Sequence, residues 1–167
     1  MKTFIRVTMV AIFVMGIFFS DQGFLYPQIS VKERNIDTNG QTRGLALRDF
    51  YAFLADGGAG LKIINMSNRS SFRMKGNLSL PGSFVEQVAV DGDLVVLTDT
   101  KKKQVHFIDA WDTSNPELLA SLKAKGDTPR AVAVHAGMAF VVEYGEKPGT
   151  TGYFSGIESF SIKEKIS

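Results

Sequence analysis

Glu86-Gln-Val-Ala-Val-Asp-Gly-Asp-Leu-Val-Val-Leu-Thr-Asp99, followed by Gln104-Val-His-Phe-Ile-Asp109, is the stretch that decides the fold. The same pattern occurs before it, in Arg43–Asp56 with Gly60–Asn65, and after it, in Arg130–Glu143 with Gly156–Ser161. Leu45, Val88 and Val132 take equivalent places, 43 and 44 residues apart. Agreement in register over so many positions indicates an internal repeat rather than shared composition.

Each copy is predicted to form four short strands. In the central copy Val88 and Val90 alternate with less apolar residues, which is typical of a half-buried first strand. Asp91-Gly92-Asp93 supplies turn chemistry, and the apolar run Leu94–Leu97 fits a second strand buried on both faces. Val105–Ala110 forms the third strand, and the polar, lysine-bearing Glu117–Lys123 suits an exposed fourth.

Four antiparallel strands in such a repeat have the size of one propeller blade. The sequence therefore predicts an all-β fold of β-propeller-type blades, with repeats at about residues 43–83, 84–127 and 128–162. Residues 23–167 form this partial propeller, and a hydrophobic N-terminal helix within residues 1–22 precedes it.

Two phrases resemble a known family. Gly60-Leu-Lys-Ile-Ile-Asn-Met-Ser-Asn68 and Val105-His-Phe-Ile-Asp-Ala-Trp-Asp-Thr-Ser-Asn-Pro116 are similar to the core of the LVIVD repeat. The resemblance covers about residues 43–162 and implies a β-propeller, usually on exported or surface proteins of prokaryotes. The family has no established general activity, so the resemblance implies a fold and a compartment and little chemistry.

Three blades are too few for a closed ring, which takes about 4–8. Residues 27–36 resemble a fourth strand, because Pro27-Gln-Ile-Ser-Val is similar to Pro116-Glu-Leu-Leu-Ala, whereas the third copy stops at its third strand. We expect either a truncated product of a longer gene or a homodimer in which two chains complete a six-bladed ring.

The first 22 residues are predicted to be a signal peptide or an N-terminal membrane anchor. Lys2 and Arg6 precede an apolar run at residues 7–19, which is typical of an export signal and could alternatively anchor the chain in a membrane. We expect a secreted, periplasmic or cell-surface protein.

Composition excludes several classes of function. The net charge of +2 comes from Lys2 and Arg6, so the body is neutral and offers no electrostatic footprint for nucleic acid. The absence of cysteine excludes disulfides, thiol catalysis and zinc–thiolate sites. No Ser-His-Asp pattern is evident, and His106 and His135, the two histidines, are expected to serve packing or the surface.

Two sets of charged residues repeat in register and form the candidate binding rim. Asp56, Asp99 and Glu143 end the second strands, and Arg43, Glu86 and Arg130 open the first strands. One interpretation is structural, in which the aspartates start hairpin turns through their own backbone and Arg pairs with Glu across blades. The other is a charged rim that holds a structural cation or a polar ligand; no other cofactor is expected.

A long loop in the third copy is a second binding candidate. The stretch from Tyr144 to Ser155 exceeds its counterparts by about eight residues, and Tyr144, Tyr153 and Phe154 could provide contact area. A tolerated insertion is the alternative.

We expect a non-catalytic exported propeller module for binding or scaffolding at the cell surface or in the envelope, with an unspecified protein or small polar ligand. The alternative is a fragment of a propeller enzyme, a hydrolase or lyase, whose catalytic residues lie outside this chain.

Overall fold

The computed structural model describes residues 7–14, 29–146 and 153–161, and this part of the chain is all-β, without a helix. The chain divides into two compact units, residues 1–37 and 38–167. The first unit holds a two-stranded sheet made of β1 (Val7–Val14) and β2 (Ile29–Ile36).

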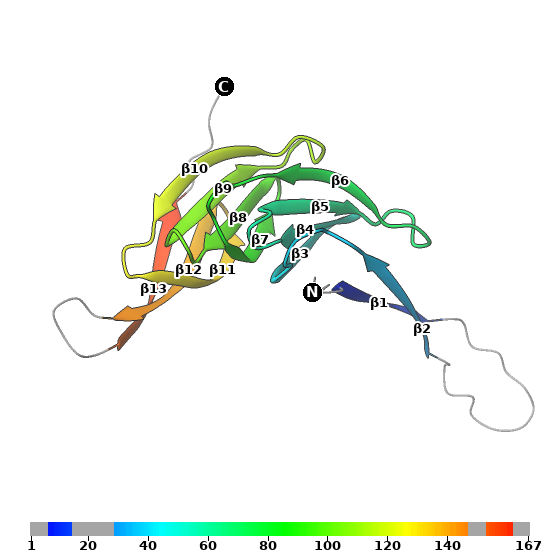
Figure 1. The fold of residues 1–167 in the computed structure, drawn as a ribbon, viewed down its shortest axis with the longest axis horizontal. Coiled ribbons are helices and arrows are strands. Elements are labelled where there is room, and N and C mark those ends of the chain that lie inside the picture. Colours follow the sequence, from blue (N-terminus) through cyan, green and yellow to red (C-terminus); the bar gives the residue numbers. More distant parts are fainter. Residues whose placement is uncertain (1–6, 15–28, 147–152, 162–167) are drawn as a thin grey trace, which may run out of the picture. The chain divides into compact units, whose positions relative to one another are not determined.

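The second unit holds three antiparallel sheets, each formed by strands that follow one another along the chain (Figure 1). The first sheet contains β3 (Gly44–Arg48), β4 (Tyr51–Ala55), β5 (Leu61–Asn65) and β6 (Arg73–Leu78). The second contains β7 (Val85–Asp91), β8 (Leu94–Asp99), β9 (Gln104–Asp109) and β10 (Glu117–Lys123). The third contains β11 (Thr128–His135), β12 (Met138–Glu146) and β13 (Tyr153–Ser161). The all-β prediction is confirmed, and the structure has three antiparallel sheets in place of the three predicted blades, the third with three strands in the described residues.

The turn between first and second strands recurs in all three sheets. Asp49, Gly92 and Ala136 occupy equivalent positions and have positive φ angles of 52°, 54° and 49°. Short hairpin turns need this left-handed backbone to match the twist of their strands. The turn predicted from the sequence is therefore present in each sheet, and in the third a residue other than glycine or aspartate adopts it.

The first strands of the sheets lie next to one another, since β7 contacts both β3 and β11. Gly44 permits this approach, because a Cβ there would lie 2.7 Å from the carbonyl oxygen of Glu86. Blades that meet along their first strands are the arrangement of a propeller, so the fold is propeller-like.

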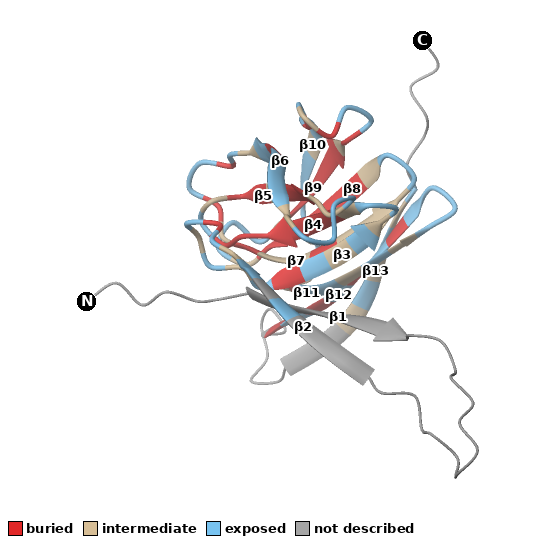
Figure 2. Ribbon diagram, turned by 90° about the vertical axis from the view of Figure 1, so that its right-hand side faces the viewer, coloured by how far each residue is buried: buried red, intermediate tan, exposed pale blue. Residues whose placement is uncertain are grey.

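The core lies between the sheets (Figure 2). Phe53, Leu97 and Ile108 belong to the cluster between the first and second sheets. Val96 and Val141 belong to the cluster between the second and third. The second strands β4 and β8 are buried on both faces, as their continuous apolar sequence predicts.

The N-terminal unit differs from the expected pairing of residues 27–36. Residues 29–36 form a strand, but it pairs with β1, and the third sheet ends at β13 in the described residues. The segment was expected to behave as a fourth blade strand, and here the apolar, β-branched run of β1 supplies its partner instead.

The leader prediction stays a prediction. Residues 7–14, which the sequence analysis assigns to a helix, are a strand here, and short apolar runs fit either structure. The rest of the leader, residues 1–6 and 15–22, lies outside the described residues. Across the part of the chain that the structure describes, no helix is long and apolar enough to span a membrane.

Candidate functional site

Three acidic residues at equivalent positions are buried, as Asp56, Asp99 and Glu143 are 0%, 0% and 3% exposed. Asp56 follows β4 and Asp99 ends β8, as predicted, whereas β12 continues past Glu143 to Glu146. Each carboxylate accepts a hydrogen bond from the loop that leads into the first strand of its own sheet. These acids therefore fasten the loops that lead into the three sheets.

Asp56 binds this loop through side chains. Its Oδ1 accepts hydrogen bonds from the hydroxyls of Thr38, at 2.8 Å, and Thr42, at 2.6 Å. Its Oδ2 is buried without a hydrogen-bond partner among the described residues. Gly40 lies so close that a Cβ there would overlap the carboxylate.

Asp99 binds mainly backbone. Its Oδ1 accepts from the N–H groups of Phe84 at 3.1 Å, Lys101 at 2.9 Å and Lys102 at 3.0 Å. The last two bonds are the hairpin-turn bonds that the structural interpretation predicted. Burial acts to raise the pKa of Asp99, but the N–H groups of Lys102 and Phe84, with the side chains of Ser83 and His106, hold it below its usual value.

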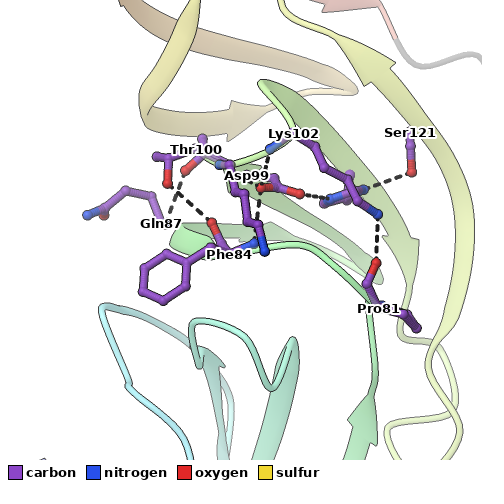
Figure 3. Close-up of polar contacts among 10 residues, drawn as sticks. Pro81, Phe84, Gln87, Asp99, Thr100, Lys102 and Ser121 are labelled. Carbon is purple, nitrogen blue, oxygen red and sulfur yellow. Dashed lines mark hydrogen bonds and ion pairs between the residues drawn. The ribbon is translucent and has the colours of Figure 1, made fainter.

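The second carboxylate oxygen of Asp99 leads to a chain of side chains that the sequence analysis missed (Figure 3). Asp99 Oδ2 lies 3.2 Å from His106 Nε2, and His106 Nδ1 lies 2.8 Å from Ser121 Oγ. His106 is 2% exposed, whereas Ser121, its cross-strand neighbour on β10, is exposed. A Ser-His-Asp arrangement is therefore present, and the expectation that none exists was wrong.

Strand pairing explains why this arrangement cannot be recognised from residue spacing in the sequence. Residues 99, 106 and 121 stand at no motif spacing, and they meet because β9 lies between β8 and β10. Predicting the register of β9 against β10 would have placed Ser121 opposite His106.

Glu143 belongs to a different cluster, which it shares with Glu158 and the loop before β11. Its Oε2 accepts from the N–H of Gly126 at 2.6 Å, and Glu158 accepts from Lys125 N–H at 3.0 Å and pairs with its ammonium at 3.1 Å. Burial raises the pKa of Glu143, and the adjoining carboxyl of Glu158 adds to this rise. Burial opposes ionisation of Glu158 too, but Lys125 and Glu143 hold its pKa below the usual value. Of the two carboxyls, Glu143 therefore binds a proton more readily than Glu158.

The first-strand residues of the predicted rim make contacts between sheets. Arg130 Nη1 lies 3.8 Å from Glu86 Oε2, which is the cross-blade pairing of the structural interpretation. Arg43 instead lies over the ring of Phe84, with 5.5 Å from its guanidinium carbon to the ring centroid. The repeated charges thus link neighbouring segments.

The cation hypothesis stays a prediction. In residues 7–14, 29–146 and 153–161 no three histidine or acidic side chains gather into a group that could hold a metal ion. Asp99 has its oxygens occupied by three N–H groups and His106. Asp56 and Glu143 belong to other sheets and bind their own loops.

The described parts of the long stretch in the third copy, residues 144–146 and 153–155, belong to β12 and β13. Tyr144 lies in β12 and is 45% exposed, while Tyr153 and Phe154 lie in β13 opposite Glu146 and Gly145. These residues lengthen the hairpin of β12 and β13, and the binding role of the stretch stays a prediction. Residues 147–152 lie outside the described part.

A cleft of about 1280 Å³ lies between the second and third sheets. β10 contributes Leu119 and Leu122 to its wall, and β13 contributes Phe160 and Ser161. β13 has no further strand on this side in the described residues. The cleft thus occupies the place where the first two sheets carry their fourth strand.

Comparison with known proteins identifies the repeat. Residues 39–79 match the LVIVD repeat. The chain carries an LVIVD repeat. The match covers the first sheet, β3 to β6.

One solved structure similar to the chain is a luciferin-regenerating enzyme, at 14% identity and a TM-score of 0.49. The alignment covers 69% of this chain, which spans 40% of the length of that enzyme. No curated protein matches the sequence.

Proposed function

We propose that this LVIVD-repeat chain is an exported binding and scaffold module that joins head to tail with a second copy of itself. The observation that carries the proposal is the difference between equivalent residues. Phe53 and Val96 are 0% exposed because the following sheet covers them, whereas Phe140, at the same position of the third sheet, is 39% exposed.

The bare face of the third sheet is continuous and apolar. Met138, Val142 and Ile157 lie on it beside Phe140, with exposures of 38%, 40% and 74%. Contiguous exposed apolar patches mark sites of association. In this chain the same face of the other two sheets binds the next sheet.

The first sheet offers the matching face. Leu45 is 48% exposed, whereas its equivalent Val88 packs against the preceding sheet and is 8% exposed. Leu47 lies on the same face as Leu45 and is 59% exposed. The face that a blade presents to its predecessor is therefore available for the third sheet of another copy.

The strand order of the repeat favours the same partner. The fourth strand of each sheet directly precedes the next sheet in the chain, as β6 precedes β7 and β10 precedes β11. The segment at residues 27–36 precedes β3 in this way and resembles a fourth strand by its sequence. In a second copy, the edge of β2 that does not pair with β1 would add to the edge of β13 and fill the cleft beside Leu119 and Leu122.

Sedimentation of the full chain tests the proposal. We expect association at micromolar concentration, and we expect Phe140→Asp to weaken it by about 30-fold or more, because a central apolar contact is worth about 2 kcal/mol. Leu118→Asp is the control, since Leu118 is 44% exposed on β10 but points away from the cleft. A synthetic peptide of residues 27–36 should compete, and a scrambled peptide should not.

Three outcomes would overturn the proposal. They are a monomeric chain, an oligomer that survives Phe140→Asp, and an oligomer that the peptide leaves unchanged.

A further inference from the structure

The chain Asp99, His106 and Ser121 has a defined direction of proton donation. A carboxylate only accepts hydrogen bonds, so the ring nitrogen that faces Asp99 must carry a proton. In neutral His106 this leaves a lone pair on Nδ1, and the hydroxyl of Ser121 donates to it across 2.8 Å. A serine that donates to an imidazole oriented by a carboxylate is an activated nucleophile.

The environment keeps the imidazole in the form that a base requires. Burial lowers the pKa of His106 below its ordinary value of 6.5, against the opposing effect of Asp99, and the charge of Lys102 lowers it further. At neutral pH the ring is therefore uncharged and can take a proton. Asp99 stays ionised, since its own pKa lies below the usual value.

Asp99 and His106 are held in fixed positions, whereas Ser121 is accessible from solvent. Asp99 and His106 are buried on neighbouring strands, and the N–H groups of Phe84, Lys101 and Lys102 fix the carboxylate. Ser121 is exposed and does not line the cleft beside β13. A small molecule can thus reach its hydroxyl from solvent.

We propose that Ser121 is a nucleophile that cleaves small, activated carboxylic esters, with His106 as general base and Asp99 as its positioning residue. This activity is independent of the proposed scaffold function. It places a nucleophile inside the chain, whereas the enzyme alternative from the sequence placed catalytic residues outside it.

The reaction balances with water as the second substrate. Ser121 Oγ bonds to the ester carbonyl carbon while Nδ1 of His106 takes the hydroxyl proton. The bond from that carbon to the alcohol oxygen breaks, and the leaving alcohol takes the proton from Nδ1. Water then attacks the acyl-serine by the same path and releases the acid and the free serine.

The chemistry sets the expected size of the effect. A positioned general base contributes about 10²- to 10⁴-fold. Substrates should be small esters with good leaving groups, because Ser121 lies on an open strand surface.

Hydrolysis of p-nitrophenyl acetate by the full chain tests the proposal, with mass spectrometry of the acetylated peptide. We expect acetylation at Ser121, and Ser121→Ala should reduce the rate by about 100-fold or more. Ser159→Ala is the matched control, as it removes an exposed serine from the third sheet and should leave the rate unchanged. The rate should also rise with pH with a midpoint below pH 6.5, following the lowered pKa of His106.

His106→Gln should abolish the pH dependence, and its melting temperature shows whether the fold persists. Phe140→Asp should keep full ester cleavage, so that failure of the scaffold proposal is distinguishable from failure of this one. Acetylation of lysines without Ser121, or equal rates in Ser121→Ala and the parent chain, would overturn the proposal.

Discussion

One position of the repeat carries a buried acid in all three sheets, and each acid binds the loop that enters its sheet. Asp56, Asp99 and Glu143 all fasten the loop that enters their sheet, yet Asp56 binds threonine hydroxyls and the other two bind N–H groups. Hydrogen bonds offset the cost of burying a carboxylate, and the entering loop supplies donors to one oxygen of each. The repetition of acids in the sequence is explained by this fastening.

Gly40 provides a residue-scale test of the fastening in the first sheet. Gly40→Ala should lower the free energy of unfolding by about 1–3 kcal/mol, because the new Cβ overlaps the Asp56 carboxylate. Chemical denaturation measures the change. Gly58→Ala is the control, since nothing lies within 4 Å of its Cβ position. Equal stabilities of the two variants would contradict the close contact.

The lowered pKa of His106 should make the free energy of unfolding depend on pH. Burial lowers its pKa in the folded chain below the value of 6.5, so folding favours the neutral ring. The contribution of His106 is full above pH 6.5 and is lost as the pH falls through the folded pKa. The free energy of unfolding should therefore fall as the pH is lowered below 6.5.

His106→Gln should flatten this slope while keeping a donor for Asp99. The lowered pKa of Asp99 acts below its ordinary value of 3.8, outside the same window. Denaturation at a series of pH values decides the matter, and an unchanged slope in the variant would assign the dependence to other groups.

At the scale of elements, the second strand of each sheet organises the molecule. β4 and β8 are buried on both faces, and β12 repeats their pattern on the side of Val141 while it leaves Phe140 bare. The sequence of a strand alone sets which residues lie on each of its two faces. Whether a face is covered depends on the presence of a neighbouring sheet.

The export hypothesis gives the leader, residues 1–22, the role of directing the body out of the cytoplasm. Expression in a secreting host followed by fractionation should place the body outside the cytoplasm. Lys2→Glu with Arg6→Glu should retain it in the cytoplasm, because the positive region before the apolar run directs export. Lys101→Glu with Lys123→Glu changes the same charge in the body and should not affect export. Full-length soluble parent protein in the cytoplasm would contradict the prediction.

At the scale of the whole molecule, stability should depend on concentration. In the proposed association only folded chains bind one another, so the melting temperature should rise with protein concentration. A 100-fold excess over the dissociation constant adds about 2.7 kcal/mol. Phe140→Asp should remove the dependence. A melting temperature that is constant over a 100-fold dilution, from about 100 μM to about 1 μM, would show that the bare faces are stable without a partner.

The sequence by itself determined the repeat, the three sheets, their strand order and the turns between first and second strands. These features are local: alternation and turn residues act within about ten positions, so the pattern around Leu94–Leu97 is enough to predict them. The sequence also located Asp56, Asp99 and Glu143 at one position of the repeat. It left open whether they start hairpin turns or form a charged binding rim.

The tertiary structure alone decided what meets across strands and sheets. Ser121 reaches His106 through the register of β9 and β10, and no spacing in the sequence specifies a register. The exposure of Phe140 at a position where Phe53 is buried follows from the lack of a covering sheet in the described residues. Equivalent residues have equal local preferences, so their different fates depend on neighbours that are distant in the sequence.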